Sequence, residues 1–251
     1  GFLILPDTVT EQTPLMIFPH GGPWAVLDTI ENSDLQLYFA SKGIASLKIN
    51  FRGSSGYGKK FLYAGIGEHG NKIEDDIQSL LLKTIDEYGF SKNKICAAGE
   101  SYGGYSALML GIRQPELIKC IISIAGPTDI PLNFTSSDFS YPPKLLKLAK
   151  ELYGDPLTDL EKMIQRSPLY QVKKIKAPVL LIHGEKDQRV TLEHANRLKL
   201  ALEKLNKPVS LIIYKNESHG FKNIENRIDE ANRMIEFIQK SLEIKKPNPD
   251  I

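Results

Sequence analysis

The 251-residue sequence has little cysteine, no strong excess of either charge and no long apolar run. A membrane-spanning helix needs about 18 consecutive apolar residues, and no run approaches that length. The 32 basic and 30 acidic residues leave a net charge of +2, without a basic stripe interleaved with aromatic residues. The first residues contain no basic segment of the kind that begins a signal peptide. We therefore expect neither a membrane nor a nucleic acid as partner.

Cysteine occurs only twice, at Cys96 and Cys120, and both residues lie in apolar segments typical of strands. Two cysteines do not make a disulfide framework in a chain of this length. The pattern predicts two buried thiols in a reducing compartment, and hence a cytoplasmic location.

Apolar strands alternate with amphipathic helices along most of the chain. Such alternation predicts an α/β fold in one domain over residues 1–251, with a mostly parallel sheet and helices on both faces. Residues 130–176 interrupt the alternation with a segment rich in proline and serine and two short helices, at 145–152 and 160–166. We predict a lid-like insertion over the active site, which in such folds lies at the carboxyl ends of the strands. The predicted strands are residues 1–5, 14–18, 45–49, 94–98, 120–124, 178–182 and 209–213.

The most specific motif is G-E-S-Y-G at residues 99–103, which follows an apolar strand and precedes an apolar helix. This context is that of a nucleophile elbow, in which a sharp turn exposes the serine hydroxyl above the sheet. The turn is tight enough to require Gly99 and Gly103, because larger side chains would clash. The motif predicts that Ser101 is a nucleophile in an α/β-hydrolase fold.

A serine nucleophile needs a base, and the base needs a carboxylate that orients it. In this fold the chain order is serine, acid, histidine. Asp187 follows the strand at 178–182, with Glu185 as the alternative acid, and His219 is the only histidine in the loop after the next strand. The other four histidines show no metal-ligand spacing, so we predict no metal and no cofactor.

An oxyanion hole needs backbone N–H groups directed at the developing negative charge. One donor is expected from Tyr102, the residue after the nucleophile. The other is expected from the loop at residues 20–23 (H-G-G-P), where paired glycines let the backbone approach a substrate.

Taken together, these segments resemble the catalytic domain of the prolyl oligopeptidase family of serine peptidases, and most closely its acylaminoacyl-peptidase-like branch. The resemblance implies that Ser101, Asp187 and His219 form the catalytic triad, with the amides of Gly22 and Tyr102 as the oxyanion hole. It rests on residues 19–24 (P-H-G-G-P-W), 50–58 (N-F-R-G-S-S-G-Y-G), 99–105 (G-E-S-Y-G-G-Y), 166–169 (R-S-P-L), 187–190 (D-Q-R-V) and 218–221 (S-H-G-F).

The same resemblance suggests an apolar specificity pocket. Family members build one wall of it after the strand that follows the elbow helix, which indicates Ile130 and Phe134 here. Tyr102 and Tyr105 are further candidates for substrate binding, and ordinary packing is the alternative for all four. Without a fixed charge, such a pocket would accept an apolar residue on the acyl side of the scissile bond.

Two arginines, Arg52 and Arg189, have two interpretations. They could bind a substrate carbonyl or a terminal carboxylate, or they could hold loops together through Asp75, Asp76 or backbone carbonyls.

The predicted function is a serine hydrolase that cleaves short peptides or N-acylated amino acids through an acyl-enzyme. Its activity should rise with pH, because the histidine must be neutral to accept a proton. A carboxylesterase with the same triad is the first alternative, and a non-catalytic binding domain with this fold is the second.

Family members usually carry an N-terminal β-propeller, and no blade-like period of short strands occurs in this sequence. The start inside an apolar strand, at Gly1, favours omission of a propeller over a stand-alone hydrolase. The apolar surface that a missing propeller leaves would favour a homo-oligomer.

Overall fold

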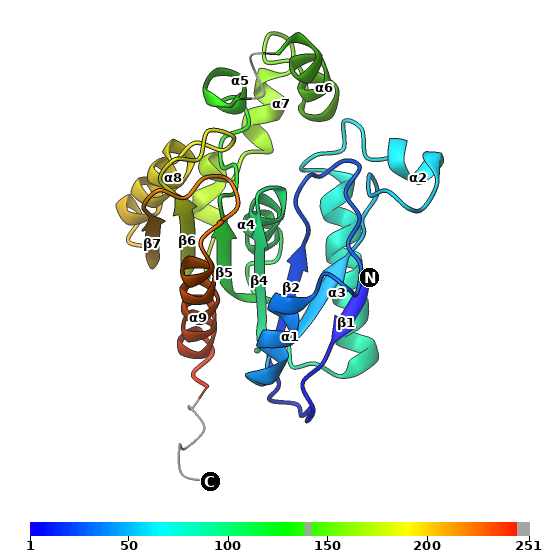
Figure 1. Cartoon of the computed structure of the whole chain (residues 1–251), viewed down its shortest axis with the longest axis vertical. Helices are drawn as coiled ribbons and strands as arrows, with labels where there is room; N and C mark the ends of the chain where they lie inside the picture. The colour runs from blue at the N-terminus through cyan, green and yellow to red at the C-terminus, as the bar shows by residue number, and fades with distance from the viewer. Residues whose placement is uncertain (139–141, 245–251) are drawn as a thin grey trace.

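A seven-stranded sheet forms the centre of the computed structural model, which describes residues 1–138 and 142–244 (Figure 1). The strand order is β1-β3-β2-β4-β5-β6-β7. β1 is antiparallel to β3 and the remaining pairs are parallel. The mostly parallel sheet of the prediction is thus confirmed. The strands are β1 (Phe2–Ile4), β2 (Leu15–Pro19), β3 (Ala45–Ile49), β4 (Ile95–Glu100), β5 (Ile118–Ile124), β6 (Val179–Gly184) and β7 (Val209–Tyr214).

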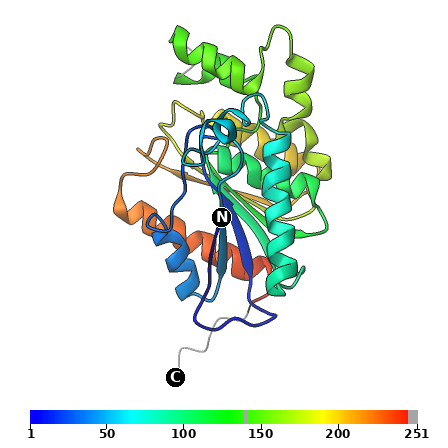
Figure 2. The same cartoon turned by 90° about the vertical axis from the view of Figure 1, so that its right-hand side faces the viewer.

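Helices cover both faces of the sheet, as the unbroken apolar strands require (Figure 2). One core lies between the sheet and α3, α4 and α8, and the other lies between the sheet and α1 and α9. The helices are α1 (Asp34–Ser41), α2 (Lys59–Tyr63), α3 (Lys72–Tyr88), α4 (Tyr102–Arg113), α5 (Asn133–Ser136), α6 (Pro143–Tyr153), α7 (Leu160–Gln165), the 3₁₀ helix η2 (Pro168–Lys174), α8 (Glu193–Lys204) and α9 (Ile224–Ser241).

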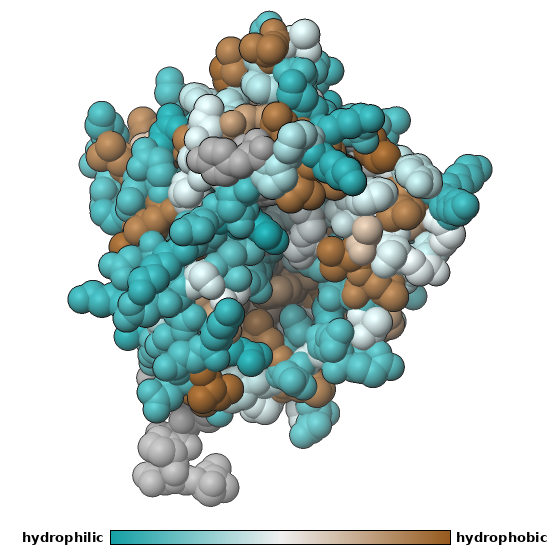
Figure 3. Space-filling model, turned by 45° about the horizontal axis from the view of Figure 1, so that its top comes forward, coloured by the Kyte–Doolittle hydropathy of each residue, from teal (hydrophilic) through white to brown (hydrophobic). Residues whose placement is uncertain are grey.

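The segment between β5 and β6 carries α5, α6, α7 and η2, with α5, α6 and α7 beyond the carboxyl ends of the strands, at the top of Figure 1. α6 and α7 confirm the two short helices predicted for this segment. Several leucines on or beside them are exposed, Leu157 by 88%. Figure 3 shows brown, apolar side chains at this end of the molecule.

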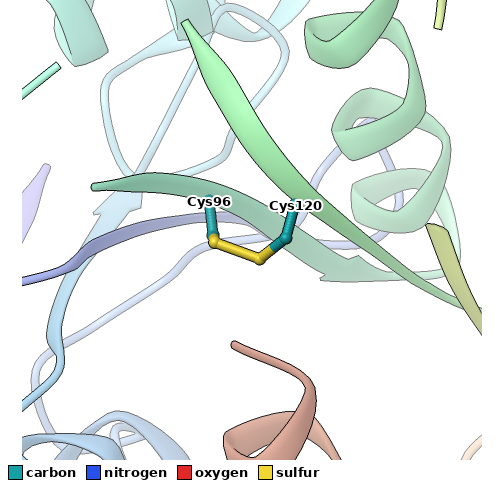
Figure 4. The surroundings of a disulfide bond; sticks show 2 residues. All are labelled: Cys96 and Cys120. Carbon is teal, nitrogen blue, oxygen red and sulfur yellow. A yellow bond between two sulfur atoms is a disulfide. The ribbon is translucent and has the colours of Figure 1, made fainter. Parts of the chain in front are cut away.

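The two cysteines form a disulfide, so the prediction of free thiols is wrong (Figure 4). Cys96 on β4 and Cys120 on β5 are direct partners in the parallel register, with their Cα atoms 4.8 Å apart. Both side chains are fully buried, and this part of the prediction is confirmed. The pairing depends on strand register, which a separation of 24 residues does not reveal.

Among the described helices, none combines the length and the apolar character that crossing a bilayer would require.

Candidate active site

The nucleophile elbow joins β4 to α4 at Ser101. Its φ of +57° lies in the left-handed region, where a residue with a side chain is strained. The Ser101 N–H donates to the carbonyl oxygen of Ile124 at 2.8 Å, and the Ser101 carbonyl accepts from the first turn of α4. A Cβ atom at Gly99 would overlap the backbone of Gly103, and one at Gly103 would overlap the carbonyl oxygen of Pro19. The steric reason predicted for both glycines is confirmed.

Two loops bring an imidazole and a carboxylate to this serine. His219 Nε2 lies 2.9 Å from Ser101 Oγ, and His219 Nδ1 lies 2.8 Å from Asp187 Oδ2. Gly184, at the end of β6, permits this approach, because a Cβ atom there would lie 2.6 Å from the carbonyl oxygens of Glu217 and Ser218. The three residues come from the carboxyl ends of β4, β6 and β7, separated by up to 118 positions in sequence.

Asp187 is buried among hydrogen-bond donors. Its Oδ1 accepts from the N–H groups of Arg189 and Val190 at 2.9 and 3.0 Å. Burial alone would raise the pKa of Asp187, but hydrogen bonds from His183, His219 and the N–H of Val190 outweigh it and hold that pKa well below its usual range. The carboxylate therefore stays charged and can orient His219.

Glu185, the alternative acid, makes no hydrogen bond with His219 in the described part of the chain. Its carboxylate accepts from the N–H of Asn216 at 3.4 Å, and the residue is exposed.

Glu217 holds the loop that carries His219, a role that no motif in the sequence indicates. Its carboxylate accepts from the side chain of Asn226 at 2.7 Å and from the N–H groups of Lys222 and Asn223 at 2.9 and 3.1 Å. These hydrogen bonds lower the pKa of Glu217, and the one from Asn226 has the largest effect. The residue stands two positions before the histidine, and this proximity was the only signal in the sequence.

The predicted oxyanion donors flank the serine. Tyr102 is the first residue of α4, so its N–H has no acceptor within the helix. The N–H of Gly22 donates to no group in the described part of the chain. The loop lies close to the nucleophile, because a Cβ atom at Gly21 would stand 3.5 Å from Ser101 Cβ.

His20 and Arg52 hold the surrounding loops. The His20 ring stacks on Phe51 at 4.2 Å, and its Nε2 lies 2.8 Å from Ser54 Oγ. Burial lowers the pKa of His20. Arg52 donates to both carboxylate oxygens of Asp76, at 2.7 and 2.6 Å. Of the two interpretations of Arg52, the structure favours the one in which this arginine holds loops together.

The residues predicted for the specificity pocket lie in or against the core. Tyr105 and Ile130 are 0% and 1% exposed, and Phe134 packs against the same core cluster. The Tyr105 hydroxyl donates to the carbonyl oxygen of Arg166 at 2.8 Å. The structure thus does not bring Tyr105 or Ile130 to an open surface.

Two cavities adjoin the loop at residues 20–23, which carries the predicted oxyanion donor Gly22. The first, of about 260 Å³, lies between that loop and α6. Its lining is mostly apolar: Gly22, Trp24, Leu145, Leu148, Ala149, Leu152, Tyr153 and Arg189. The second, of about 890 Å³, lies toward α1 and α9 and is lined by Gly21 and Glu100 among others. Arg189 at the first cavity also faces Asp138 at 3.5 Å.

Two of the carboxyl groups that line the larger cavity, those of Glu100 and Glu230, have raised pKa values. Burial raises the pKa of Glu230 to about 8, and the nearby charge of Glu100 adds to the effect. Burial also raises the pKa of Glu100, the residue before the nucleophile. Within residues 1–138 and 142–244, no three His, Cys, Asp or Glu side chains are placed to hold a metal ion.

A sequence profile of the prolyl oligopeptidase family matches residues 31–245. The chain belongs to the prolyl oligopeptidase family. It is 34% identical over 215 residues to dipeptidyl aminopeptidase BIII of Pseudoxanthomonas mexicana, covering 85% of this chain and 31% of that protein. It is 29% identical over 224 residues to the acylamino-acid-releasing enzyme of Mus musculus, covering 85% and 29%.

A solved acylaminoacyl peptidase in complex with Z-Gly-Gly-Phe-chloromethyl ketone superposes with a TM-score of 0.87 at 30% identity, covering 99% of this chain and 40% of that one. This likeness confirms the α/β-hydrolase fold. The chain spans about a third of the length of the first curated relatives that it matches.

Proposed function

We propose that the chain is a serine hydrolase that acts through an acyl-enzyme, with Ser101, His219 and Asp187 as its triad. The observation that carries this proposal is the continuous set of contacts from Ser101 Oγ to His219 Nε2 and from His219 Nδ1 to Asp187 Oδ2, at 2.9 and 2.8 Å. A serine hydroxyl is a weak nucleophile at neutral pH, and such a base–acid pair is the arrangement that activates it.

In the first half of the reaction, His219 Nε2 accepts the Ser101 proton as Oγ bonds to the substrate carbonyl carbon. The resulting oxyanion accepts from the N–H groups of Gly22 and Tyr102, and the charged Asp187 stabilises the imidazolium. His219 then gives its proton to the leaving group as the scissile bond breaks. In the second half, water attacks the ester carbonyl with His219 again as base, which releases the acid and regenerates Ser101.

The proposed substrates are short peptides or N-acylated amino acids, cleaved on the carbonyl side of an apolar residue. The names of the relatives support this class, and the Phe of the chloromethyl ketone held by one of them supports an apolar acyl-side residue. The mostly apolar cavity beneath α6 offers space for such a side chain. Helices α5, α6 and α7 would then act as a lid over the site.

The test compares an acetyl-Phe p-nitrophenyl ester with the corresponding p-nitroanilide, using Ser101→Ala as control. If the parent chain cleaves both substrates and Ser101→Ala cleaves neither, the result supports the peptidase. Cleavage of the ester alone supports a carboxylesterase, because the leaving group of an ester needs less protonation than that of an amide. Absence of any Ser101-dependent cleavage contradicts the enzyme proposal and favours a binding domain.

A cytoplasmic location is part of the same proposal and rests on the low cysteine content. The Cys96–Cys120 disulfide weighs against it, because disulfides persist mainly in oxidising compartments. Acid quenching of the cells, followed by denaturation, alkylation of thiols and mass spectrometry, decides the matter, because denaturation exposes the two buried side chains. Alkylation of both cysteines supports a reducing compartment, and an intact disulfide contradicts it.

A further inference from the structure

A buried carboxyl group lies between α3 and α4, close to the nucleophile elbow. Glu74 stands in the first turn of α3 and has no exposed surface. Its Oε1 accepts from the Tyr102 hydroxyl at 2.7 Å and from Ser106 Oγ at 2.9 Å. Its Oε2 has no partner in the described part of the chain. A buried acid of this kind needs an explanation beyond packing, because apolar side chains would fill the same space without unpaired polar atoms.

Glu74 contacts the part of α4 that sets the oxyanion site. Tyr102 directly follows the nucleophile and begins α4. Ser106 lies one helical turn further along, on the same face. A single oxygen atom therefore binds the first two turns of α4 and restricts rotation of the helix about its axis. Because the Tyr102 N–H is fixed to that backbone, such a rotation would change its direction relative to Ser101.

Aromatic neighbours position the rest of the Tyr102 side chain. Its ring centroid lies 5.7 Å from that of Phe51, 4.9 Å from that of His69 and 5.4 Å from that of Tyr105. The hydroxyl at the tip of the ring donates a hydrogen bond to Glu74. The aromatic rings therefore hold the ring of Tyr102, and Glu74 holds its hydroxyl.

We propose that Glu74 is a positioning residue for the oxyanion site, acting through the Tyr102 and Ser106 hydroxyls to direct the Tyr102 N–H at the substrate. The inference rests on the proposed function, because it gives that N–H a role in hydrolysis. Glu74 itself touches neither the substrate nor the reacting atoms.

The protonation of Glu74 adds a pH dependence to this role. Burial raises the pKa of Glu74 to about 7, although the hydrogen bonds from Tyr102 and Ser106 oppose the shift. The tyrosines that face it, Tyr102 and Tyr105, have pKa values well above their usual range and remain neutral. Arg113 is the cation that lowers the pKa of Glu74, and its guanidinium pairs with Asp75. Above pH 7 the carboxylate therefore ionises within the core.

The experiment compares Glu74→Leu, which removes the acceptor, with Glu74→Gln, which keeps an acceptor oxygen without a charge. We expect Glu74→Leu to lower kcat for the acetyl-Phe ester about 10- to 100-fold with KM within about twofold, less than the loss of a whole oxyanion donor. Glu74→Gln should retain kcat within about threefold. Glu87→Leu, on the exposed part of the same helix, is the matched control and should change neither constant.

Tyr102→Phe removes the hydroxyl and keeps the amide. If both residues act through one contact, the double variant with Glu74→Leu should lose little more activity than either single variant. Losses that multiply would overturn the proposal. A lower melting temperature of Glu74→Leu with unchanged kcat would overturn it as well, because the residue would then be structural only.

A readout independent of activity separates this proposal from the proposed function. In ¹⁵N-tyrosine-labelled protein, the Tyr102 amide signal is assigned by its absence from Tyr102→Phe. We expect it to shift in Glu74→Leu, and its pH titration to lose one step in Glu74→Gln. An unchanged signal in both variants overturns the positioning role. A changed signal in an enzyme without Ser101-dependent turnover would support the positioning role and contradict the proposed function.

Discussion

Replacing Asp187 by Asn should invert the hydrogen bonding of His219 without changing the shape of the site. Asp187 Oδ1 accepts from two backbone N–H groups, those of Arg189 and Val190. In the variant the carboxamide oxygen must take this place, because an NH₂ group would face two donors. The NH₂ group then faces His219 Nδ1, which has to become an acceptor. His219 Nε2 would carry the proton and could no longer accept that of Ser101.

The magnitude follows from this tautomer. Loss of the correct tautomer in such a triad lowers kcat by about 10⁴-fold, roughly 5 kcal/mol of transition-state stabilisation. We expect this loss for Asp187→Asn on the acetyl-Phe ester, together with slower labelling of Ser101 by an organophosphonate. Thermal unfolding shows whether the variant is folded at the assay temperature.

Asp138→Asn is the matched control, because it removes a carboxylate that faces Arg189 in the same region. It should keep kcat within about twofold. A loss below tenfold in a folded Asp187→Asn protein would refute the role given to this carboxylate, and so would a labelling rate equal to that of the unmodified chain.

Three further outcomes are expected. Gly99→Ala should abolish activity, because the new Cβ atom would overlap the backbone of Gly103; turnover near that of the parent chain in a kinetic assay would contradict this. Reduction of the Cys96–Cys120 disulfide, which closes a loop of about 25 residues, should lower the free energy of unfolding in urea by about 3 kcal/mol, and an unchanged midpoint would oppose it. Because the pKa of Glu74 is raised to about 7, the folded chain binds the proton of this carboxyl group more tightly than the unfolded chain does. The resulting contribution to the free energy of unfolding should be present at pH 4 and fall by roughly 3 kcal/mol by pH 8. Glu74→Gln should lack this fall, and equal pH–stability curves for the two proteins would contradict the assignment.

The sequence was sufficient to predict the sheet and the position of the elbow. The strand at 45–49 coincides with β3, and the others agree with the observed strands to within two residues at each end. These strands are predictable because both faces of a parallel sheet are covered, which leaves an unbroken apolar run. The elbow is predictable because its flanking glycines are a local steric requirement.

The features that the sequence did not predict depend on contacts between distant segments. Cys96 and Cys120 pair only because β4 and β5 are neighbours in one register. Glu74 follows Ile73 on a helix that carries apolar residues at helical spacing, where an acid is expected to face solvent; α4 buries it instead. The apolar cavity beneath α6 involves the oxyanion loop and a helix more than a hundred positions later, so no local pattern indicates it.

The common origin of Ser101, Asp187 and His219 at one edge of the sheet restricts how the length of the chain can vary. A strand advances by about 3.3 Å per residue, so one residue added between a strand and its active-site side chain would displace that side chain by more than the 2.8–2.9 Å contacts tolerate. Insertions and deletions between the end of β4 and Ser101 are therefore excluded, and the connections after β6 and β7 can change length only where Asp187 and His219 keep their positions. The connections at the opposite edge and the segment from α5 to η2 are free of this restriction, and diversity of length among related chains should be greatest there.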